Sequence, residues 1–76
     1  MKNLHQRAEN HRIAGVKAMT SRLWPAAVSE FERAARLSPR DALMWLNLAR
    51  AHLHNGRVDD AITSAREALR LDPSSP

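Results

Sequence analysis

The sequence predicts an all-α protein of four helices, arranged as two antiparallel helix-turn-helix hairpins. Three observations support this fold class. Alanine, leucine and arginine dominate the 76 residues, and all three have a high helix propensity. No stretch alternates apolar and polar residues as a half-buried strand does. Helix-breaking residues divide the chain into four segments, and each segment carries apolar residues at helical spacing.

The first hairpin is predicted from about Asn3 to Thr20 and from Trp24 to Leu37. Pro25 suits the first turn of a helix, because the N–H that proline lacks would have no helical partner there. The second segment stops before Pro39. Its apolar stripe consists of Ala27, Phe31, Ala34 and Ala35. We expect this stripe to form part of the core.

The second hairpin is predicted from about Asp41 to His54 and from Val58 to Leu71. The pair Asn55 and Gly56 is typical of a helix C-terminus. The apolar stripes are Trp45, Leu48, Ala49 and His52 in the third segment, and Ala61, Ala65, Ala68 and Leu69 in the fourth. The many alanines allow close approach of the helix axes, and the short connections make neighbouring helices antiparallel.

The chain repeats itself with a period of 34 residues. Between 27–39 and 61–73, five of thirteen pairs are identical, where chance gives about one. The identical positions in the first copy are Ala27, Ala34, Arg36, Leu37 and Pro39. A period in this range is typical of solenoid proteins.

The period and the residues resemble the tetratricopeptide repeat, whose pattern is W-x2-L-G-x2-Y, then A-x3-F, then P. The second copy has Trp45, Leu48, Ala61 and Pro73 at these positions, and the first has Gly15, Ala27, Phe31 and Pro39. His11 replaces the usual tryptophan. The resemblance implies a short right-handed α-solenoid, with repeats at 8–41 and 42–75, a short Ser/Pro tail, and residues 1–7 extending the first helix.

Composition limits the function. The net charge is +4, but acidic and basic residues are mixed, which is typical of a solvated surface. No nucleophile–base set, phosphate-binding loop or metal-ligand spacing is present, so we predict no enzyme, no cofactor and no metal site. We expect His11 and His52 to fill aromatic positions in the core, and Trp24 and Trp45 to be core residues. The sequence has no apolar run long enough for a membrane helix, so the expected location is cytoplasmic.

The resemblance also implies a function, because the first helix of each tetratricopeptide repeat lines a concave face that binds peptides. The predicted partner-binding residues are Arg12, Val16, Leu43, Leu46, Asn47, Arg50 and His54. Leu43 and Leu46 are surplus to the core stripe, which supports a groove for a protein or peptide partner with acidic groups. The alternative is that both leucines pack against the N-terminal extension or another copy. Val16 stands where the carboxylate clamp of some relatives has asparagine, so we do not expect that specific activity.

The fourth segment suggests a second function. A tetratricopeptide hairpin normally buries its outer face against the next repeat, and two hairpins leave the last face uncovered. We therefore expect self-association through Ile62, Leu69 and Leu71, either as a self-assembling or docking domain or as part of a larger protein. A third alternative is a basic nucleic-acid surface, which we expect least because no aromatic residues accompany the arginines. Its residues would be Arg33, Arg36, Arg40, Arg66 and Arg70.

Overall fold

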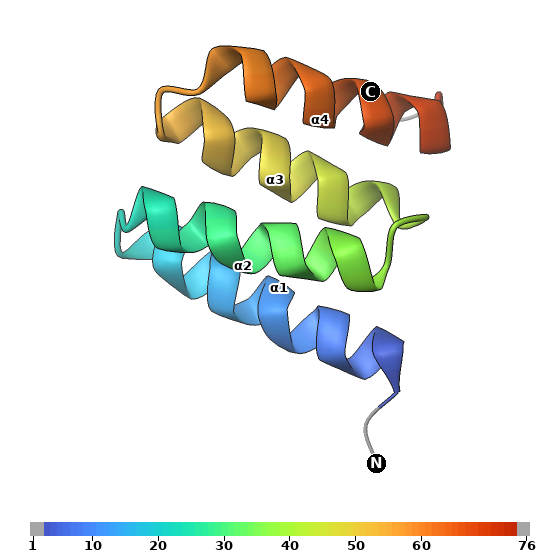
Figure 1. The fold of residues 1–76 in the computed structure, drawn as a ribbon, viewed down its shortest axis with the longest axis horizontal. Coiled ribbons are helices and arrows are strands. Elements are labelled where there is room, and N and C mark those ends of the chain that lie inside the picture. Colours follow the sequence, from blue (N-terminus) through green and yellow to red (C-terminus); the bar gives the residue numbers. More distant parts are fainter. Residues whose placement is uncertain (1–2, 75–76) are drawn as a thin grey trace.

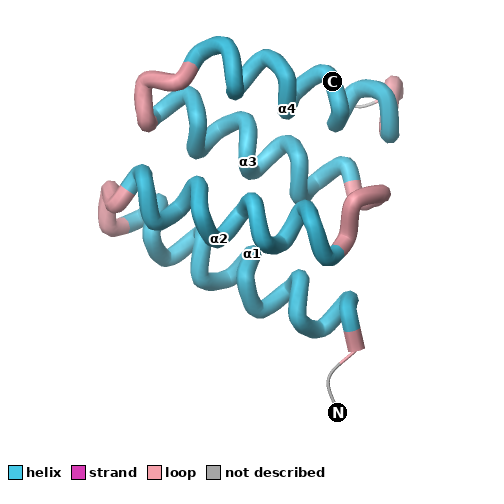
Figure 2. Tube along the Cα trace, in the orientation of Figure 1, coloured by secondary structure: helices cyan, strands magenta, loops and turns pink. Residues whose placement is uncertain are grey.

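The computed structural model describes residues 3–74 and contains four helices. They are α1 (Leu4–Thr20), α2 (Trp24–Leu37), α3 (Ala42–His54) and α4 (Val58–Leu71). Each helix packs on the next one in the chain, and successive helices run in opposite directions (Figure 1). Within the described residues only short loops separate the helices (Figure 2). The predicted stack of two helical hairpins is confirmed.

The predicted unit boundaries are only partly covered by the structure. Residues 1–2 of the expected N-terminal extension and residues 75–76 of the expected tail lie outside the described residues. The division into repeats at 8–41 and 42–75 stays a prediction.

Side-chain caps explain where two of the helices begin. The amide oxygen of Asn3 accepts a hydrogen bond from the backbone N–H of Gln6 at 2.7 Å. A carboxylate oxygen of Asp41 accepts one from the N–H of Leu43 at 3.0 Å. Asparagine and aspartate are preferred at this position because they satisfy N–H groups that have no partner inside the helix. The expected starts near Asn3 and Asp41 are therefore the caps of α1 and α3.

The turn inside each hairpin closes with the same hydrogen-bond pattern. After α3, Gly56 has a φ of 75°, and the N–H of Arg57 donates to the carbonyl of His52 at 2.8 Å. After α1, Arg22 takes the same left-handed conformation with a φ of 58°. This conformation suits glycine, and it costs a residue with a side chain about 1 kcal/mol. The first hairpin thus makes the same turn with a less suitable residue.

Two clusters of buried apolar residues tie the hairpins together. One consists of Ala8, Ala34, Ala35 and Met44, and the other of Ala27, Phe31, Leu48 and Ala51. They come from α1, α2 and α3, so α3 is the element that joins the second hairpin to the first. Phe31 and Met44 are the largest fully buried side chains among the described residues. The whole predicted stripe of α2 is buried, as expected.

Helix α3 buries more of its surface than one stripe. The predicted stripe residues Leu48, Ala49 and His52 are buried, and Trp45 is half-buried against both clusters. Met44, which the stripe did not include, is also buried. Since α3 packs between α2 and α4, it is covered on two sides, and a search for a single apolar stripe finds only one of them.

Gly15 allows the Phe31 ring of α2 to pack directly against α1. A Cβ atom at Gly15 would lie 2.5 Å from Cε1 of Phe31, far inside van der Waals contact. The buried Phe31 ring therefore occupies the space that a side chain at position 15 would need. The equivalent pair in the second hairpin is Ala49 and Ala65. Ala49 has a methyl group where Gly15 has no side chain, and Ala65 has no ring where Phe31 has one. The two hairpins thus fill the same pair of positions with side chains of different volume.

The two histidines predicted for the core have different environments. His52 is buried, and its Nδ1 has no hydrogen-bond partner among the described residues. The core prediction for His11 is wrong: its side chain is 30% exposed and its Nδ1 lies 2.9 Å from Oε1 of Glu30. An imidazole has two nitrogen atoms that need partners, so a carboxylate on α2 holds His11 at the edge of the hairpin.

Candidate binding face on α1 and α3

The first helix of each hairpin carries the residues predicted to bind a partner. On α3, the residues Leu43, Asn47, Arg50 and His54 are three or four positions apart and share one face. Leu43 is 48% exposed, Arg50 is exposed, and Asn47 and Leu46 are half-buried. This face lies opposite the buried side of α3, which includes Met44, Leu48 and Ala51. It therefore combines an accessible apolar group with an amide and a guanidinium.

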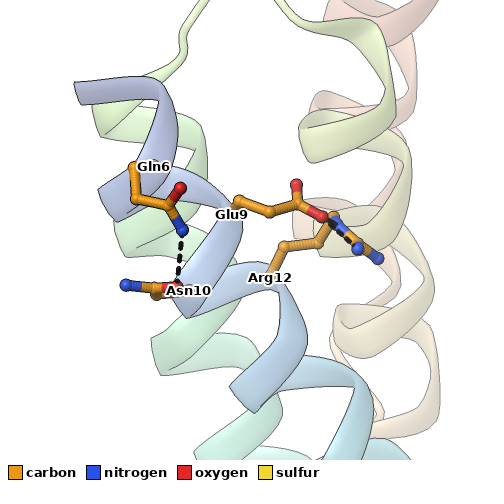
Figure 3. A network of polar contacts seen from close by, with 4 residues as sticks. All are labelled: Gln6, Glu9, Asn10 and Arg12. Atoms are coloured by element: carbon orange, nitrogen blue, oxygen red, sulfur yellow. Dashed lines mark hydrogen bonds and ion pairs between the residues drawn. The ribbon is translucent and has the colours of Figure 1, made fainter. Parts of the chain in front are cut away.

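On α1, the predicted binding residue Arg12 is already paired within its own helix. Its Nε donates to Oε1 of Glu9 at 2.9 Å, and its Nη2 contacts the same oxygen. Figure 3 shows both side chains on the side of α1 opposite Gln6 and Asn10, which form a separate hydrogen bond of 3.2 Å. A guanidinium has five N–H donors, so Glu9 leaves part of Arg12 available to another carboxylate.

The charges around Arg12 extend from α1 to the start of α3. The hydrogen bond that Arg12 donates to Glu9 raises the pKa of Arg12 above its ordinary value, and the negative charge of Asp41 adds to this effect. The same hydrogen bond lowers the pKa of Glu9. Asp41 caps α3, so Arg12 lies within electrostatic reach of both helices of the candidate face. Sequence reasoning missed that Glu9 would occupy Arg12, and the spacing of three residues between them was the available signal.

His54 lies at the far end of α3 and contacts α2. Its ring stacks on the ring of Trp24, with the centroids 4.7 Å apart and an interplanar angle of 18°. One face of the imidazole is therefore covered by Trp24, which leaves only the other face and the edge for a partner. Val16, on α1, is 42% exposed and makes an apolar contribution of its own.

The residues predicted for self-association are found on α4. Ile62 and Leu69 are exposed, whereas Leu71 is half-buried. Sequence reasoning missed two neighbours of this surface, Leu53 and Val58, which are also exposed. Their positions in the 34-residue repeat, equivalent to Met19 and Trp24, were the signal that could have identified them.

The arginines of the nucleic-acid alternative are divided between different surroundings. Arg33 and Arg36 line a hollow of about 360 Å³ together with Arg7 and His11. Arg70 is bound by the carboxylate of Glu67. Arg40 borders a separate hollow beside His5 and Asp41.

Among residues 3–74, no group of three or more histidine, cysteine, aspartate or glutamate side chains is placed to hold a metal ion. None of the four helices has both the length and the apolar character needed to cross a membrane.

The arrangement of two hairpins and the period of 34 residues agree with a comparison to known families. The sequence profile of the tetratricopeptide repeat matches residues 14–76, which is most of the chain. The chain belongs to the tetratricopeptide repeat family. Tetratricopeptide repeats are protein-interaction modules, and this chain carries two of them.

Relatives within the tetratricopeptide repeat family include much longer proteins. The small glutamine-rich tetratricopeptide repeat-containing protein 2 of Saccharomyces cerevisiae is 31% identical over 68 residues, which are 90% of this chain and 20% of the relative. The protein of the same name from Mycosarcoma maydis is 33% identical over 67 residues, or 88% of this chain and 19% of the relative. The Hsp70-Hsp90 organizing protein of Triticum aestivum is 25% identical over 67 residues, which are 88% of this chain and 12% of the relative. The chain thus spans about a fifth of the length of the first two relatives.

Proposed function

We propose that this pair of tetratricopeptide repeats binds a segment of a partner protein on the face of α1 and α3. The observation that carries the proposal is the exposed Leu43, which shares one face of α3 with Asn47 and Arg50. An exposed leucine beside hydrogen-bonding groups is typical of surfaces that bind peptides. Membership of a family of interaction modules supports the same function.

The chemistry of the face favours a segment that carries carboxylates. The guanidinium groups of Arg12 and Arg50 form strong, directional hydrogen bonds with carboxylate oxygens. The amide of Asn47 offers both a donor and an acceptor to the backbone of an extended segment. Leu43 and Val16 would cover apolar side chains between these polar contacts. The net charge of +4 accelerates the encounter with an acidic partner.

The variant Leu46→Ala with Arg50→Glu tests the proposed face. It removes an apolar contact and reverses a charge, so binding of an acidic segment is expected to fall at least about 30-fold, or about 2 kcal/mol. The probe is a fluorescent peptide selected from a displayed random library on the unmodified chain, and fluorescence anisotropy measures its affinity. Far-UV circular dichroism is expected to show unchanged helicity.

A matched control makes the same two chemical changes elsewhere. Leu23→Ala with Arg36→Glu alters an exposed leucine and an exposed arginine at the two ends of α2. This control is expected to bind within about twofold of the unmodified chain. If the α3 variant and the control bind the peptide equally well, the proposed face is wrong.

Glu9→Gln is expected to strengthen binding of the same acidic peptide. Glu9 competes for Arg12, and removing its charge frees the guanidinium and ends the repulsion toward incoming carboxylates. A gain of roughly two- to fivefold is expected, because the pair is half-buried at the surface and contributes little. Glu67→Gln is the control, because it releases Arg70 from an equivalent pair on α4. Equal gains in both variants would show that only the net charge matters and would contradict a role for Arg12.

A further inference from the structure

The 34-residue repeat provides an internal template for what the uncovered side of the second hairpin can bind. In the first hairpin, Ala27 and Phe31 of α2 are buried under Leu48 and Ala51 of α3, and the half-buried Met19 and Val28 pack against them. Among residues 3–74, no helix covers the equivalent residues of the second hairpin. Leu53, Val58 and Ile62, the counterparts of Met19, Trp24 and Val28, are 59%, 54% and 44% exposed.

This uncovered surface is hollowed rather than flat. A groove of about 250 Å³ runs between α3 and α4. Its lining residues are Ala49, Arg50, Leu53, Val58, Ala61, Ile62 and Ala65. Ala65 stands where Phe31 stands in the first hairpin, so the groove has the volume that a ring occupies in the other copy. A large apolar side chain from outside is needed to fill it.

A second copy of the chain does not fit this groove as the next repeat in a row. Its α1 would have to take the place of α3, and the counterparts of Met44, Leu48 and Ala51 on α1 are Asn10, Ala14 and Lys17. Asn10 and Lys17 are exposed. Burying an amide and an ammonium group in an apolar groove without partners is strongly unfavourable.

We propose instead that α4 pairs with α4 of a second copy, antiparallel, about a two-fold axis. The apolar stripe on the uncovered side of α4 consists of the exposed Val58, Ile62 and Leu69 and the half-buried Ala65. Its spacing of four, three and four residues is the same in both directions. An antiparallel pairing therefore places Val58 opposite the partner's Leu69, and Ile62 opposite the partner's Ala65. The side chain of Ile62 then fills the hollow beside the partner's Ala65, and the two-fold axis creates this contact a second time.

The charges beside the stripe fit the same pairing. Asp59 and Arg66 each follow a stripe residue, lie seven positions apart and share one flank of α4. Neither forms an ion pair with another group in residues 3–74, whereas their neighbours Arg57 with Asp60 and Glu67 with Arg70 do. A two-fold axis that reverses the helix keeps this flank on the same side. The axis brings Asp59 near the partner's Arg66 and brings Arg66 near the partner's Asp59, which gives two equivalent ion pairs.

The α3 side of the interface is compatible with this arrangement. Leu53 extends the apolar surface beside Val58. The side chain of Arg50 is exposed and long enough to cover apolar surface with its methylene groups while the guanidinium stays in water. Leu71 is half-buried and lies about half a turn from the stripe around α4, so the proposed interface does not include it.

Sedimentation velocity over a range of concentrations tests the pairing directly. The unmodified chain is expected to pass from monomer to dimer at micromolar concentrations, because the apolar area is small. Asp59→Arg and Arg66→Asp each replace two attractions with two repulsions, so each is expected to dimerise at least about tenfold more weakly. Mixing these two variants is expected to restore dimers, since a heterodimer has both ion pairs in the attractive sense.

The double variant Asp59→Arg with Arg66→Asp is expected to recover the unmodified affinity to within about threefold. Glu32→Arg with Arg36→Asp makes a comparable swap on α2 and is expected to leave dimerisation unchanged. Far-UV circular dichroism is the control for folding, and every variant is expected to keep the helicity of the unmodified chain. A chain that stays monomeric at the highest concentration would overturn the proposal, as would single swaps without effect or a mixture that forms no heterodimer.

Discussion

Replacing Phe31 with alanine is expected to lower the free energy of unfolding by about 3–5 kcal/mol. The ring is only 2% exposed and belongs to the cluster that joins α2 to α3. Its removal leaves a cavity among Ala27, Leu48 and Ala51, because neighbouring helices collapse only partly into such a space. A domain of this size has a total stability of roughly 4–11 kcal/mol. The variant is therefore expected to be close to unfolding at room temperature.

Urea denaturation followed by far-UV circular dichroism measures this loss. Leu23→Ala is the control, since Leu23 is exposed, and its effect is expected to stay within about 0.5 kcal/mol. Both variants are compared at low protein concentration, so that association does not contribute to stability. A loss below about 1 kcal/mol for Phe31→Ala would show that this ring is not the principal contact between the hairpins.

Replacing Gly15 with alanine is expected to destabilise the protein by about 1–2 kcal/mol, although alanine is the better helix former by about 1 kcal/mol. The new Cβ would lie 2.5 Å from the Phe31 ring, and the ring is enclosed by α3 and cannot move away freely. Thermal and urea unfolding measure the change. The same substitution in a Phe31→Leu background is expected to be neutral or stabilising, because the clash is gone.

The second hairpin offers a matched control for this exchange. Ala49 is the counterpart of Gly15, and it faces no phenylalanine because Ala65 replaces Phe31. Ala49→Gly is therefore expected to cost only about 1 kcal/mol through helix propensity. Alanine would then be unfavourable at one site and glycine at its equivalent. If Gly15→Ala raises the melting temperature in the unmodified background, the close packing of α1 on α2 does not constrain this position.

Much of the candidate face could be predicted from spacing alone. Leu43, Asn47 and Arg50 recur at helical intervals, and the structure places them on the exposed side of α3. Spacing makes a pair of Glu9 and Arg12 possible but does not determine it, and spacing could not show that His54 would stack on Trp24. The first depends on which of several rotamers a surface pair adopts. The second joins two helices 30 residues apart in the chain.

The sequence by itself determined the four helices, their ends and their order. Caps, prolines and the Asn55–Gly56 pair act within a few residues, so their effects can be read locally. Only the tertiary structure decided which faces are covered. It buried Met44, left His11 at an edge beside Glu30, and left Leu53 and Val58 in solvent. The physical reason is that burial depends on neighbouring helices, and the helical period of one segment does not contain their positions.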